Sequence, residues 1–382
     1  MTKASMPLKI ILKSMERFKT FIKNEIVFTL ALVLAISSSF VVTPSTEYID
    51  YIDFKTLALL LGLMLIVQGL KSCGLLDSLV TTLVKRISSK RSLAFVLVSL
   101  CFFTSMLITN DVALITFVPF TIMVLALCDD SRFSIYLIVL ETVAANLGSM
   151  FTPIGNPQNL YLYSISGIEV GEFLKLMLPY TSLSYIALLV AIYFVDNEPF
   201  GGSYSALPDS KAEKLPLVVY LALFAFCILT VLHIVDYRIM LVVVIVVIAI
   251  MDRRLLLKAD YILLLTFVAF FIFIGNMKNI PAISDFLNSV VAGREVYVSV
   301  AASQVVSNVP AAMLLSGFTD NLKGLIIGTN IGGLGTIIAS MASLISYKYY
   351  CKISGSNQKL YMGKFTIVNL VFLAILLVAY MI

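Results

Sequence analysis

Long apolar segments separated by short polar ones dominate the chain and predict a bundle of membrane-crossing helices. Uninterrupted apolar segments of helical length occupy 26–43, 55–70, 173–194, 215–233, 238–251, 260–276 and 361–382. Regions 133–165 and 322–346 contain a Gly-rich interruption, and we interpret each as one broken helix that crosses the membrane. Regions 92–127 and 296–317 carry a Ser/Thr-Asn motif in the middle, which predicts a helical hairpin that enters and returns on the same side. The pattern predicts an all-α polytopic membrane protein with two re-entrant hairpins and two broken transmembrane helices.

Composition agrees with this class. Hydrophobic residues make up 60% of the chain, charged residues make up 13%, and the mean hydropathy is +1.01. About a quarter of the residues of a soluble domain are charged, so the chain is expected in a membrane. His233 is the only histidine and the five cysteines are scattered, so neither a nucleophile–base pair nor a set of metal ligands is evident. We therefore expect no enzymatic activity, no nucleic-acid partner, and no cofactor other than a coupling ion.

The distribution of basic residues predicts the orientation. With the N-terminus in the cytoplasm, nine crossings and two hairpins that do not cross, the cytoplasmic segments hold 21 of the 27 Lys and Arg residues. The outer segments hold 6, which is the bias expected of the positive-inside rule. The protein is thus expected to be a multi-pass protein of the cytoplasmic membrane with a cytoplasmic N-terminus.

Two pairs of motifs repeat in the same order. SMLITNDVA at 105–113 is echoed by SQVVSNVPA at 303–311, and NLGSMFTPIGN at 146–156 is echoed by NIGGLGTIIAS at 330–340. Because the threading places the second copy with the opposite orientation, the chain is predicted to be an inverted repeat. The predicted parts are an N-terminal amphipathic surface helix (1–25), a first repeat (26–194), an inter-repeat loop and linker helix (195–233), and a second repeat (234–382).

The hairpin tips carry the candidate chemistry. A chain that turns back inside the membrane leaves bare carbonyls at the end of one helix, which suit a cation, and bare N–H groups at the start of the next, which suit an anion. Ser105 and Thr109 are four residues apart, so they share a helix face with Asn110 at the tip, and the second hairpin repeats this with Ser303, Ser307 and Asn308. Hydroxyl, amide and carbonyl oxygens fit a small hard cation such as sodium. The alternative interpretation is that these residues only cap ordinary helices.

Two acidic residues fall inside the predicted membrane region. Asp111 is placed at the first tip, where it could hold a cation or carry a proton, or serve only as a helix cap. Glu141 is placed on the first broken helix, where one hydrogen-bonded partner would satisfy it structurally. Both are candidate coupling residues.

The motifs resemble those of the ion transporter superfamily, which includes divalent-anion/sodium symporters, citrate transporters, arsenite permeases and certain sodium/proton antiporters. The resemblance implies two sodium sites, one formed by Ser105, Thr109, Asn110 and Gly148, and the other by Ser303, Ser307, Asn308 and Gly332. It also implies a substrate between the tips, and the substrate-binding candidates are Thr109, Asn110, Asp111, Thr152, Ser307, Asn308 and Thr336. An elevator-like motion, often within a homodimer, is implied as well.

The tips depart from the dicarboxylate branch of that superfamily, which has Ser-Asn-Thr at both tips. Here the third positions are Asp111 and Val309, and the motifs contain no Arg or Lys for an oxyanion. This tip pattern looks closer to the arsenite permeases. The leading hypothesis is a sodium- or proton-coupled secondary transporter of a small anion or oxyacid in contact with membrane lipid. The alternatives are an arsenite or metalloid efflux permease, a sodium/proton antiporter, or a channel-like pore.

Overall fold

Most of the described chain is helical. The computed structural model describes residues 25–84, 87, 89–125, 131–199 and 213–382. No strand occurs among these residues, and the only bridge between extended residues there joins Ser89 to Pro199. The surface helix predicted at 1–25 and most of the predicted inter-repeat loop lie outside the described residues, apart from short flanks.

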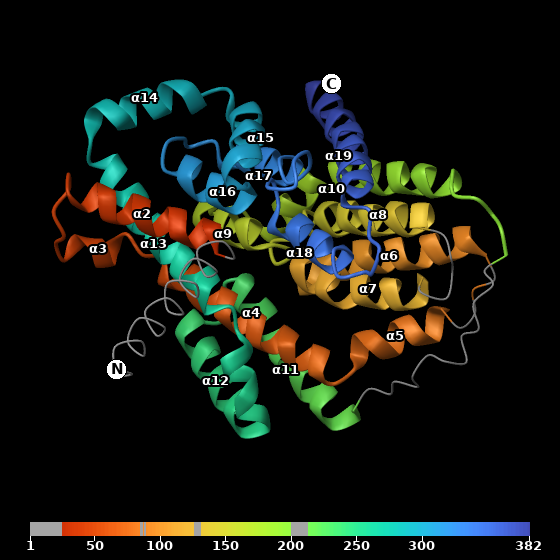
Figure 1. Ribbon diagram of the computed structural model, residues 1–382. Helices are drawn as coiled ribbons and strands as arrows, with labels where there is room; N and C mark the ends of the chain where they lie inside the picture. Colours follow the sequence, from red (N-terminus) through yellow and green to blue (C-terminus); the bar gives the residue numbers. More distant parts are fainter. Residues whose placement is uncertain (1–24, 85–86, 88, 126–130, 200–212) are drawn as a thin grey trace, which may run out of the picture. The chain divides into compact units, whose positions relative to one another are not determined.

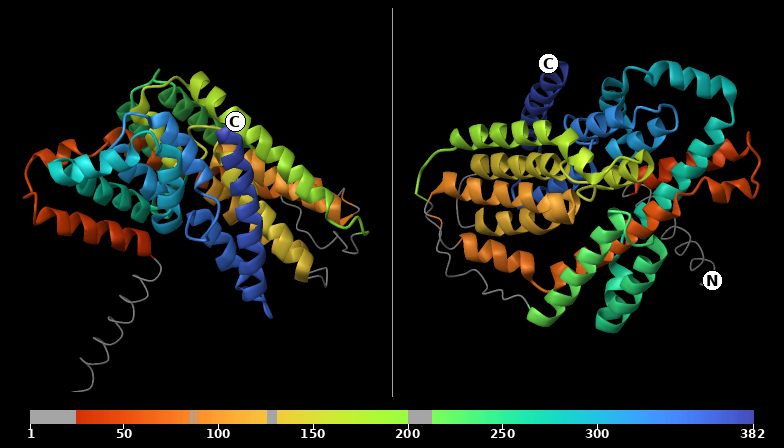
Figure 2. Two further views of the ribbon diagram at one scale, coloured as in Figure 1. Left: turned by 90° about the horizontal axis from the view of Figure 1, so that it is seen from above. Right: turned by 180° about the vertical axis from the view of Figure 1, so that it is seen from behind.

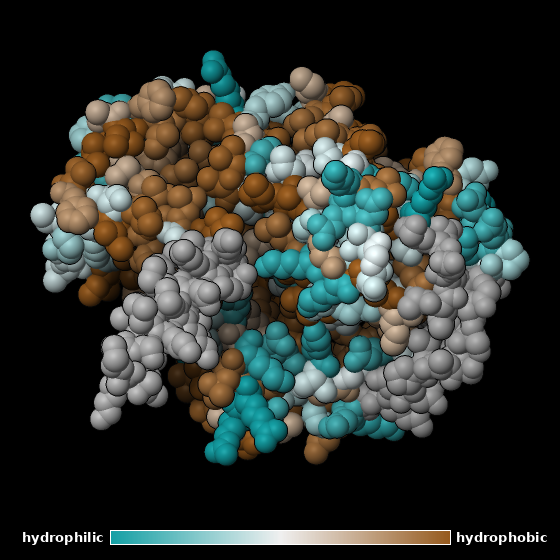
Figure 3. Space-filling model, in the orientation of Figure 1, coloured by the Kyte–Doolittle hydropathy of each residue, from teal (hydrophilic) through white to brown (hydrophobic). Residues whose placement is uncertain are grey.

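Within the part of the chain that the structure describes, six helices are long and apolar enough to cross a membrane. They are α4 (Phe54–Ser72), α6 (Lys90–Ile108), α10 (Val170–Tyr193), α11 (Lys214–Val231), α13 (Tyr261–Lys278) and α19 (Gln358–Met381). Large apolar side chains stand exposed on the outer faces of such helices, for example Ile186 of α10 and Ile367 of α19. Figure 3 shows how widely apolar residues cover the visible surface. The prediction of an all-α polytopic membrane protein is confirmed.

The described chain divides into two compact units, of which the smaller contains residues 25–53 and 260–286. Its helices are α2 (Ile26–Ser39), the short α3 (Glu47–Asp50) and α13. Asn276 of α13 donates hydrogen bonds to the hydroxyls of Ser38 and Tyr48, at 2.9 Å each, which ties the three helices together. Helix α14 (Pro281–Val291) begins in this unit and ends in the larger one.

One bundle of the larger unit contains the first hairpin. Helices α6, α7 (Asn110–Leu125), α8 (Ser131–Ser149) and α10 lie side by side (Figures 1 and 2). Helix α8 lies between the others, and its residues from 137 to 149 are all buried, so it forms the centre of this bundle. The buried stretch of α8 is mostly apolar, as suits a helix with neighbours on several sides, and it also contains the polar Glu141 and Asn146.

A second bundle of the larger unit contains the second hairpin. Helices α15 (Glu295–Val306), α16 (Asn308–Ser316) and α17 (Leu322–Ile331) pack against one another as α6, α7 and α8 do. The second segment of each broken helix packs in the bundle that does not contain its first segment. Helix α9 (Pro157–Ser166), which follows α8, packs on α16 and α17, whereas α18 (Met341–Tyr350), which follows α17, packs on α7 and α8.

Helix α19 packs on α8 and α10, and the other remaining helices of the larger unit gather around α4. Helices α11 and α12 (Tyr237–Asp252) both pack on α4, with α5 (Leu75–Val84) and the 3₁₀ helix η2 (Arg253–Lys258) at its far end. Each unit contains segments from before and after the linker at 195–233, so the units do not coincide with the two predicted repeats. The two units are defined by how densely their residues pack, which says nothing about an internal repeat. The predicted repeat boundaries therefore stay a prediction.

Candidate ion and substrate site

The two hairpin tips share an unusual backbone conformation. Only Thr109 separates α6 from α7, and only Ser307 separates α15 from α16. Thr109 has φ 72° and ψ 150°, and Ser307 has φ 76° and ψ 155°, a region that is populated almost only by glycine. A residue with a Cβ there costs about 1–3 kcal/mol, and such residues gather at ligand clamps and active sites. The structure thus places a strained hydroxyl residue at both predicted tips.

Each tip is fastened to the loop of the broken helix in its own half. The backbone N–H of Asn110 donates to the carbonyl oxygen of Gly155 at 3.1 Å, and that of Asn308 donates to the carbonyl of Ala339 at 2.9 Å. Gly155 and Ala339 occupy matching positions in the second pair of repeated motifs. These bonds occupy a donor at each tip that the helix itself would leave unpaired, and they help to hold the strained residue in place.

Two threonines predicted to bind substrate, Thr152 and Thr336, form hydrogen bonds to the hairpins. The Thr152 hydroxyl donates to the carbonyl of Met106, and the Thr336 hydroxyl donates to the carbonyl of Gln304 at 3.3 Å. Met106 and Gln304 each lie three residues before the strained tip residue. Since these hydroxyl protons already bind the hairpin, Thr152 and Thr336 position the tips and offer a ligand only their oxygen lone pairs.

Asn146 of α8 binds the other half of the chain with both atoms of its side-chain amide. Its Oδ1 accepts from the Ser340 hydroxyl at 3.0 Å, and its Nδ2 donates to the Ser343 hydroxyl oxygen at 3.3 Å. The same Oδ1 accepts from Nδ2 of Asn110 at 3.1 Å. One buried asparagine therefore joins the first tip to the start of α18.

Asn330 of α17 makes the corresponding contacts in the opposite direction. Its Oδ1 accepts from Asn156 at 3.0 Å, and its Nδ2 donates to Oδ1 of Asn159 at 2.6 Å. Asn330 matches Asn146, and Asn156 matches Ser340, in the repeated motifs. A reciprocal pair of buried amide contacts thus links the two halves at the level of the broken-helix loops. These amides are fixed in position because each has several partners.

The structure brings each predicted glycine against the serine assigned to the same ion site. A Cβ built on Gly148 would lie 2.6 Å from the Ser105 hydroxyl oxygen, and one built on Gly332 would lie 2.7 Å from that of Ser303. Only glycine permits this approach, because contacts shorter than 3.0 Å would force the neighbour to shift. Both serines are fully buried, and each donates its proton to a carbonyl of its own helix. Their oxygen lone pairs are the atoms that a cation would use.

Asp111 lies in the first turn of α7, next to the first tip, and is partly exposed. Its backbone N–H donates to Oδ1 of Asn110 at 3.0 Å. In the first turn of a helix, the helix dipole favours a negatively charged side chain such as this carboxylate. The second tip has the apolar Val309 at this position.

Glu141 lies deeper in the first bundle than the tip. It is five residues before Asn146 on α8, which corresponds to about 7.5 Å along the helix. Its side chain is fully buried, its Oε1 accepts a hydrogen bond of 2.5 Å from the Thr121 hydroxyl, and its Oε2 has no partner among the described residues. A single hydroxyl does not compensate a buried carboxylate, so this carboxyl is far easier to bury as the neutral acid. Glu141 is thus not a member of the tip cluster.

Helix capping does not account for the second tip. Helix α16 begins at Asn308, and the Ser307 side chain makes no capping hydrogen bond to it, donating instead to the Ala339 carbonyl at 3.4 Å. Among the described residues, the Thr109 hydroxyl has no hydrogen-bond partner.

The prediction missed several polar residues that build the site. The amides that link the halves are Asn146, Asn156, Asn159 and Asn330, with Ser340 and Ser343 as partners, and Gln304 binds the second broken-helix loop. The signal for most of them was present in the sequence, since Asn146 and Asn330 begin the repeated Gly-rich motifs. Their partners could not be identified because the contacts join residues more than 170 positions apart.

Long apolar helices and paired polar hairpin tips fastened to broken helices define a class, the multi-pass membrane transporters. The family model described as "Citrate transporter" matches residues 10–323. An uncharacterized transporter of Methanocaldococcus jannaschii is 33% identical over 330 residues, covering 85% of this chain and 87% of the relative. The inner membrane protein YbiR of Escherichia coli is 32% identical over 328 residues, covering 84% of this chain and 87% of the relative. The P protein of Homo sapiens is 31% identical over 126 residues, covering 31% of this chain and 14% of that protein.

The chain belongs to the citrate transporter family of the ion transporter superfamily. This membership confirms the resemblance stated from the motifs, and it identifies the protein as a membrane transporter.

Proposed function

We propose that this protein is a cation-coupled secondary transporter of a small carboxylate or other oxyacid anion, with sodium or the proton as the coupling ion. The observation that supports this most is the pair of strained hydroxyl residues, Thr109 and Ser307, at matching tips. The strain costs free energy at two places, and both places are next to helix ends that have bare polar backbone groups. A pair of ligand clamps explains the strain, whereas two ordinary turns would use glycine.

The tips offer complementary chemistry for a cation and an anion. The last turns of α6 and α15 present carbonyl oxygens, and the serine oxygens held against Gly148 and Gly332 add neutral ligands for sodium. The first turns of α7 and α16 present the positive end of the helix dipole, which favours an anion. In this proposal Asn110 and Asn308 contact the substrate, and Asp111 or Glu141 takes up the coupling proton or senses the coupling ion.

The proposed setting is the cytoplasmic membrane with the N-terminus inside. The positive-inside bias supports this orientation, and the E. coli relative is named an inner membrane protein. We further propose that the hairpin-bearing part moves as a body during transport, in an elevator-like manner within a homodimer. The many hydrogen bonds that fasten each tip to a broken-helix loop support movement as one body.

Counterflow in proteoliposomes tests the proposal. Vesicles loaded with unlabelled citrate should accumulate labelled citrate against its concentration gradient in the wild type. Asn110→Ala and Asn308→Ala should abolish this exchange. Asn321→Ala is the matched control, because Asn321 caps α17 outside the tips, with its Oδ1 3.0 Å from the Gly324 nitrogen. Exchange that survives both tip variants would refute the site, and uncoupled flux without counterflow would indicate a channel.

Asp111→Asn separates coupling from capping. If Asp111 couples transport to a cation, this variant should exchange citrate normally but lose uptake driven by a sodium or proton gradient. Asparagine caps a helix about as well as aspartate, so a purely structural role predicts a change of only a few tenths of a kcal/mol in stability. Gradient-driven uptake at the wild-type level, with unchanged sodium and pH dependence, would exclude the coupling role.

A further inference from the structure

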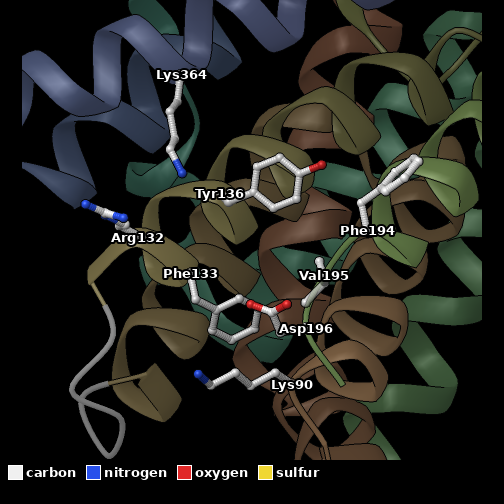
Figure 4. Close-up of a pocket in the computed structure, with 8 residues that line it drawn as sticks. All are labelled: Lys90, Arg132, Phe133, Tyr136, Phe194, Val195, Asp196 and Lys364. Carbon is white, nitrogen blue, oxygen red and sulfur yellow. The ribbon is translucent and has the colours of Figure 1, made fainter. Parts of the chain in front are cut away.

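A cavity of about 240 Å³ opens far from the hairpin tips, where several helices of the larger unit begin or end (Figure 4). Lys90, Arg132 and Lys364 line it, together with Tyr136, Phe194 and Asp196. Lys90 is the first residue of α6 and Thr109 follows the last, so the cavity lies about 28 Å along α6 from the tip. It is therefore separate from the candidate ion and substrate site.

Positive charge in this cavity exceeds negative charge. Lys90 is neutralised by Glu198, with 2.7 Å between the ammonium and the carboxylate. Among the described residues, neither Arg132 nor Lys364 forms an ion pair. Figure 4 shows Arg132 and Lys364 on one side of the cavity and Asp196 and Lys90 on the other. Among the described residues, Asp196 is the one acidic residue that lines the cavity, so the charge that these residues offer a ligand is net positive.

The helix dipoles add to this positive potential. Helices α6 and α8 both begin at the cavity; the first turn of α6 contains Lys90 and Arg91, that of α8 contains Arg132, and neither turn contains an acidic residue. Helix N-termini normally favour acidic residues, because each carries the equivalent of roughly half a positive charge. Basic residues at two adjoining N-termini are unfavourable by themselves, and an anion bound between them would relieve the repulsion.

The cavity lies at the ends of candidate membrane spans. Helix α6 begins there, α10 ends there at Tyr193, and Lys364 lies in the second turn of α19, so three of the six apolar spans meet at this level. The next residue, Phe194, is 77% exposed, and Tyr193 is 68% exposed. Exposed aromatic residues at span ends are typical of the membrane–water interface. Basic pockets between transmembrane helices on the cytoplasmic side are typical binding sites for anionic lipid headgroups.

We propose that this cavity binds the phosphate of an anionic phospholipid headgroup. Arg132 and Lys364 contact the phosphate, and the exposed Phe194 contacts the upper part of the lipid. Lys364 stands 5.8 Å from the centre of the Tyr136 ring, which holds its ammonium toward the cavity. The proposal does not depend on the transported substrate, and its failure would leave the proposed function untouched.

Native mass spectrometry of the full chain in detergent, titrated with phosphatidylglycerol or phosphatidylcholine, tests the site. The wild type should retain phosphatidylglycerol in preference to phosphatidylcholine. The double variant Arg132→Gln, Lys364→Gln should bind phosphatidylglycerol roughly 30-fold more weakly, because each basic residue near an anionic surface contributes about a factor of five. The matched control is Arg253→Gln, Arg254→Gln, which removes the same charge from two exposed residues of η2. This control should bind like the wild type.

Three results would overturn the proposal. Equal loss in the control variant would show that only overall charge matters, and an unchanged double variant would show that the cavity does not bind the headgroup. A third arm titrates inorganic phosphate and glycerol 3-phosphate against bound phosphatidylglycerol. Displacement by these soluble anions at low millimolar concentration would assign the cavity to a free anion in place of a lipid. No displacement, together with the loss in the double variant, supports the lipid site.

Discussion

The strained backbone at the tips makes an unusual prediction about stability. Replacing Thr109 by glycine should raise the thermal stability of the protein while it abolishes transport. The reason is that φ 72° with ψ 150° is unfavourable for any residue with a Cβ and is freely accessible to glycine. The hydroxyl at the tip, which we assign to ligand binding, is lost in the same change.

The magnitude follows from two opposing contributions. Relief of the strain stabilises the folded state by about 1–3 kcal/mol. The greater freedom of glycine in the unfolded chain costs about 0.5–1 kcal/mol. The net effect is stabilisation by about 1 kcal/mol, which corresponds to a melting temperature roughly 1–3 °C higher for a chain of this size. Ser307→Gly should behave in the same way, because its backbone angles are nearly the same.

Thermal unfolding in detergent, followed by tyrosine fluorescence, measures this shift. Thr109→Ala is the reference, since alanine lacks the hydroxyl but keeps the Cβ and therefore keeps the strain. Thr104→Gly is the control, because Thr104 lies within α6 in an ordinary helical conformation, where glycine destabilises. The reasoning is wrong if Thr109→Gly melts below Thr109→Ala, or if it transports at the wild-type rate.

Other features of the larger unit give three further predictions. Asn146→Ala and Asn330→Ala should each lower the free energy of unfolding by about 2–4 kcal/mol and slow transport, because each change leaves at least two buried polar partners unpaired. Differential scanning calorimetry measures the loss, and an unaffected variant would contradict the reciprocal role of the two residues. Glu141→Gln should keep the Thr121 hydrogen bond and wild-type stability but remove the pH dependence of uptake, and an unchanged pH profile would exclude a coupling role. Partial burial is the larger cause, and the nearby Lys55 ammonium the smaller one, that lowers the pKa of His233 in the folded protein. The unfolded state therefore binds more protons than the folded state, and stability falls as the pH drops through about 6.5. His233→Asn, which tolerates the positive φ at that position, should flatten this fall in melting temperature between pH 7.5 and 5.5.

The helices were predictable because each signal is local. Apolar length predicted α4, α10, α11, α13 and α19 to within a few residues, and the polar interruptions at Thr109 and Ser307 predicted where two helices would reverse. The Gly-rich motifs marked the breaks between α8 and α9 and between α17 and α18 for the same reason. The resemblance to the superfamily grouped Gly148 with Ser105, and the structure holds this glycine against this serine.

The contacts between the halves were not predictable from one sequence. Asn146 could have bound any of many polar partners, and its choice of Ser340 depends on how α18 packs on α7 and α8. The same applies to Glu141, whose partner Thr121 lies in the mostly apolar part of the hairpin arm α7. Backbone strain is likewise invisible in sequence, since Thr109 and Ser307 are residues that normally avoid such angles.

We propose that the two tips bind the coupling cation, and the dependence of stability on the cation tests this most directly. Thermal unfolding of the purified protein is measured while sodium replaces choline at constant ionic strength, and again from pH 6 to 8. A cation that binds only the folded state at ten times its dissociation constant adds about 1.4 kcal/mol of stability. We predict this gain in stability for the wild type and for the control Ser184→Ala, which changes a buried serine away from the tips. We predict that Ser105→Ala and Ser303→Ala lose the gain. Stability that responds to neither cation, or that responds equally in the tip variants, would contradict the account.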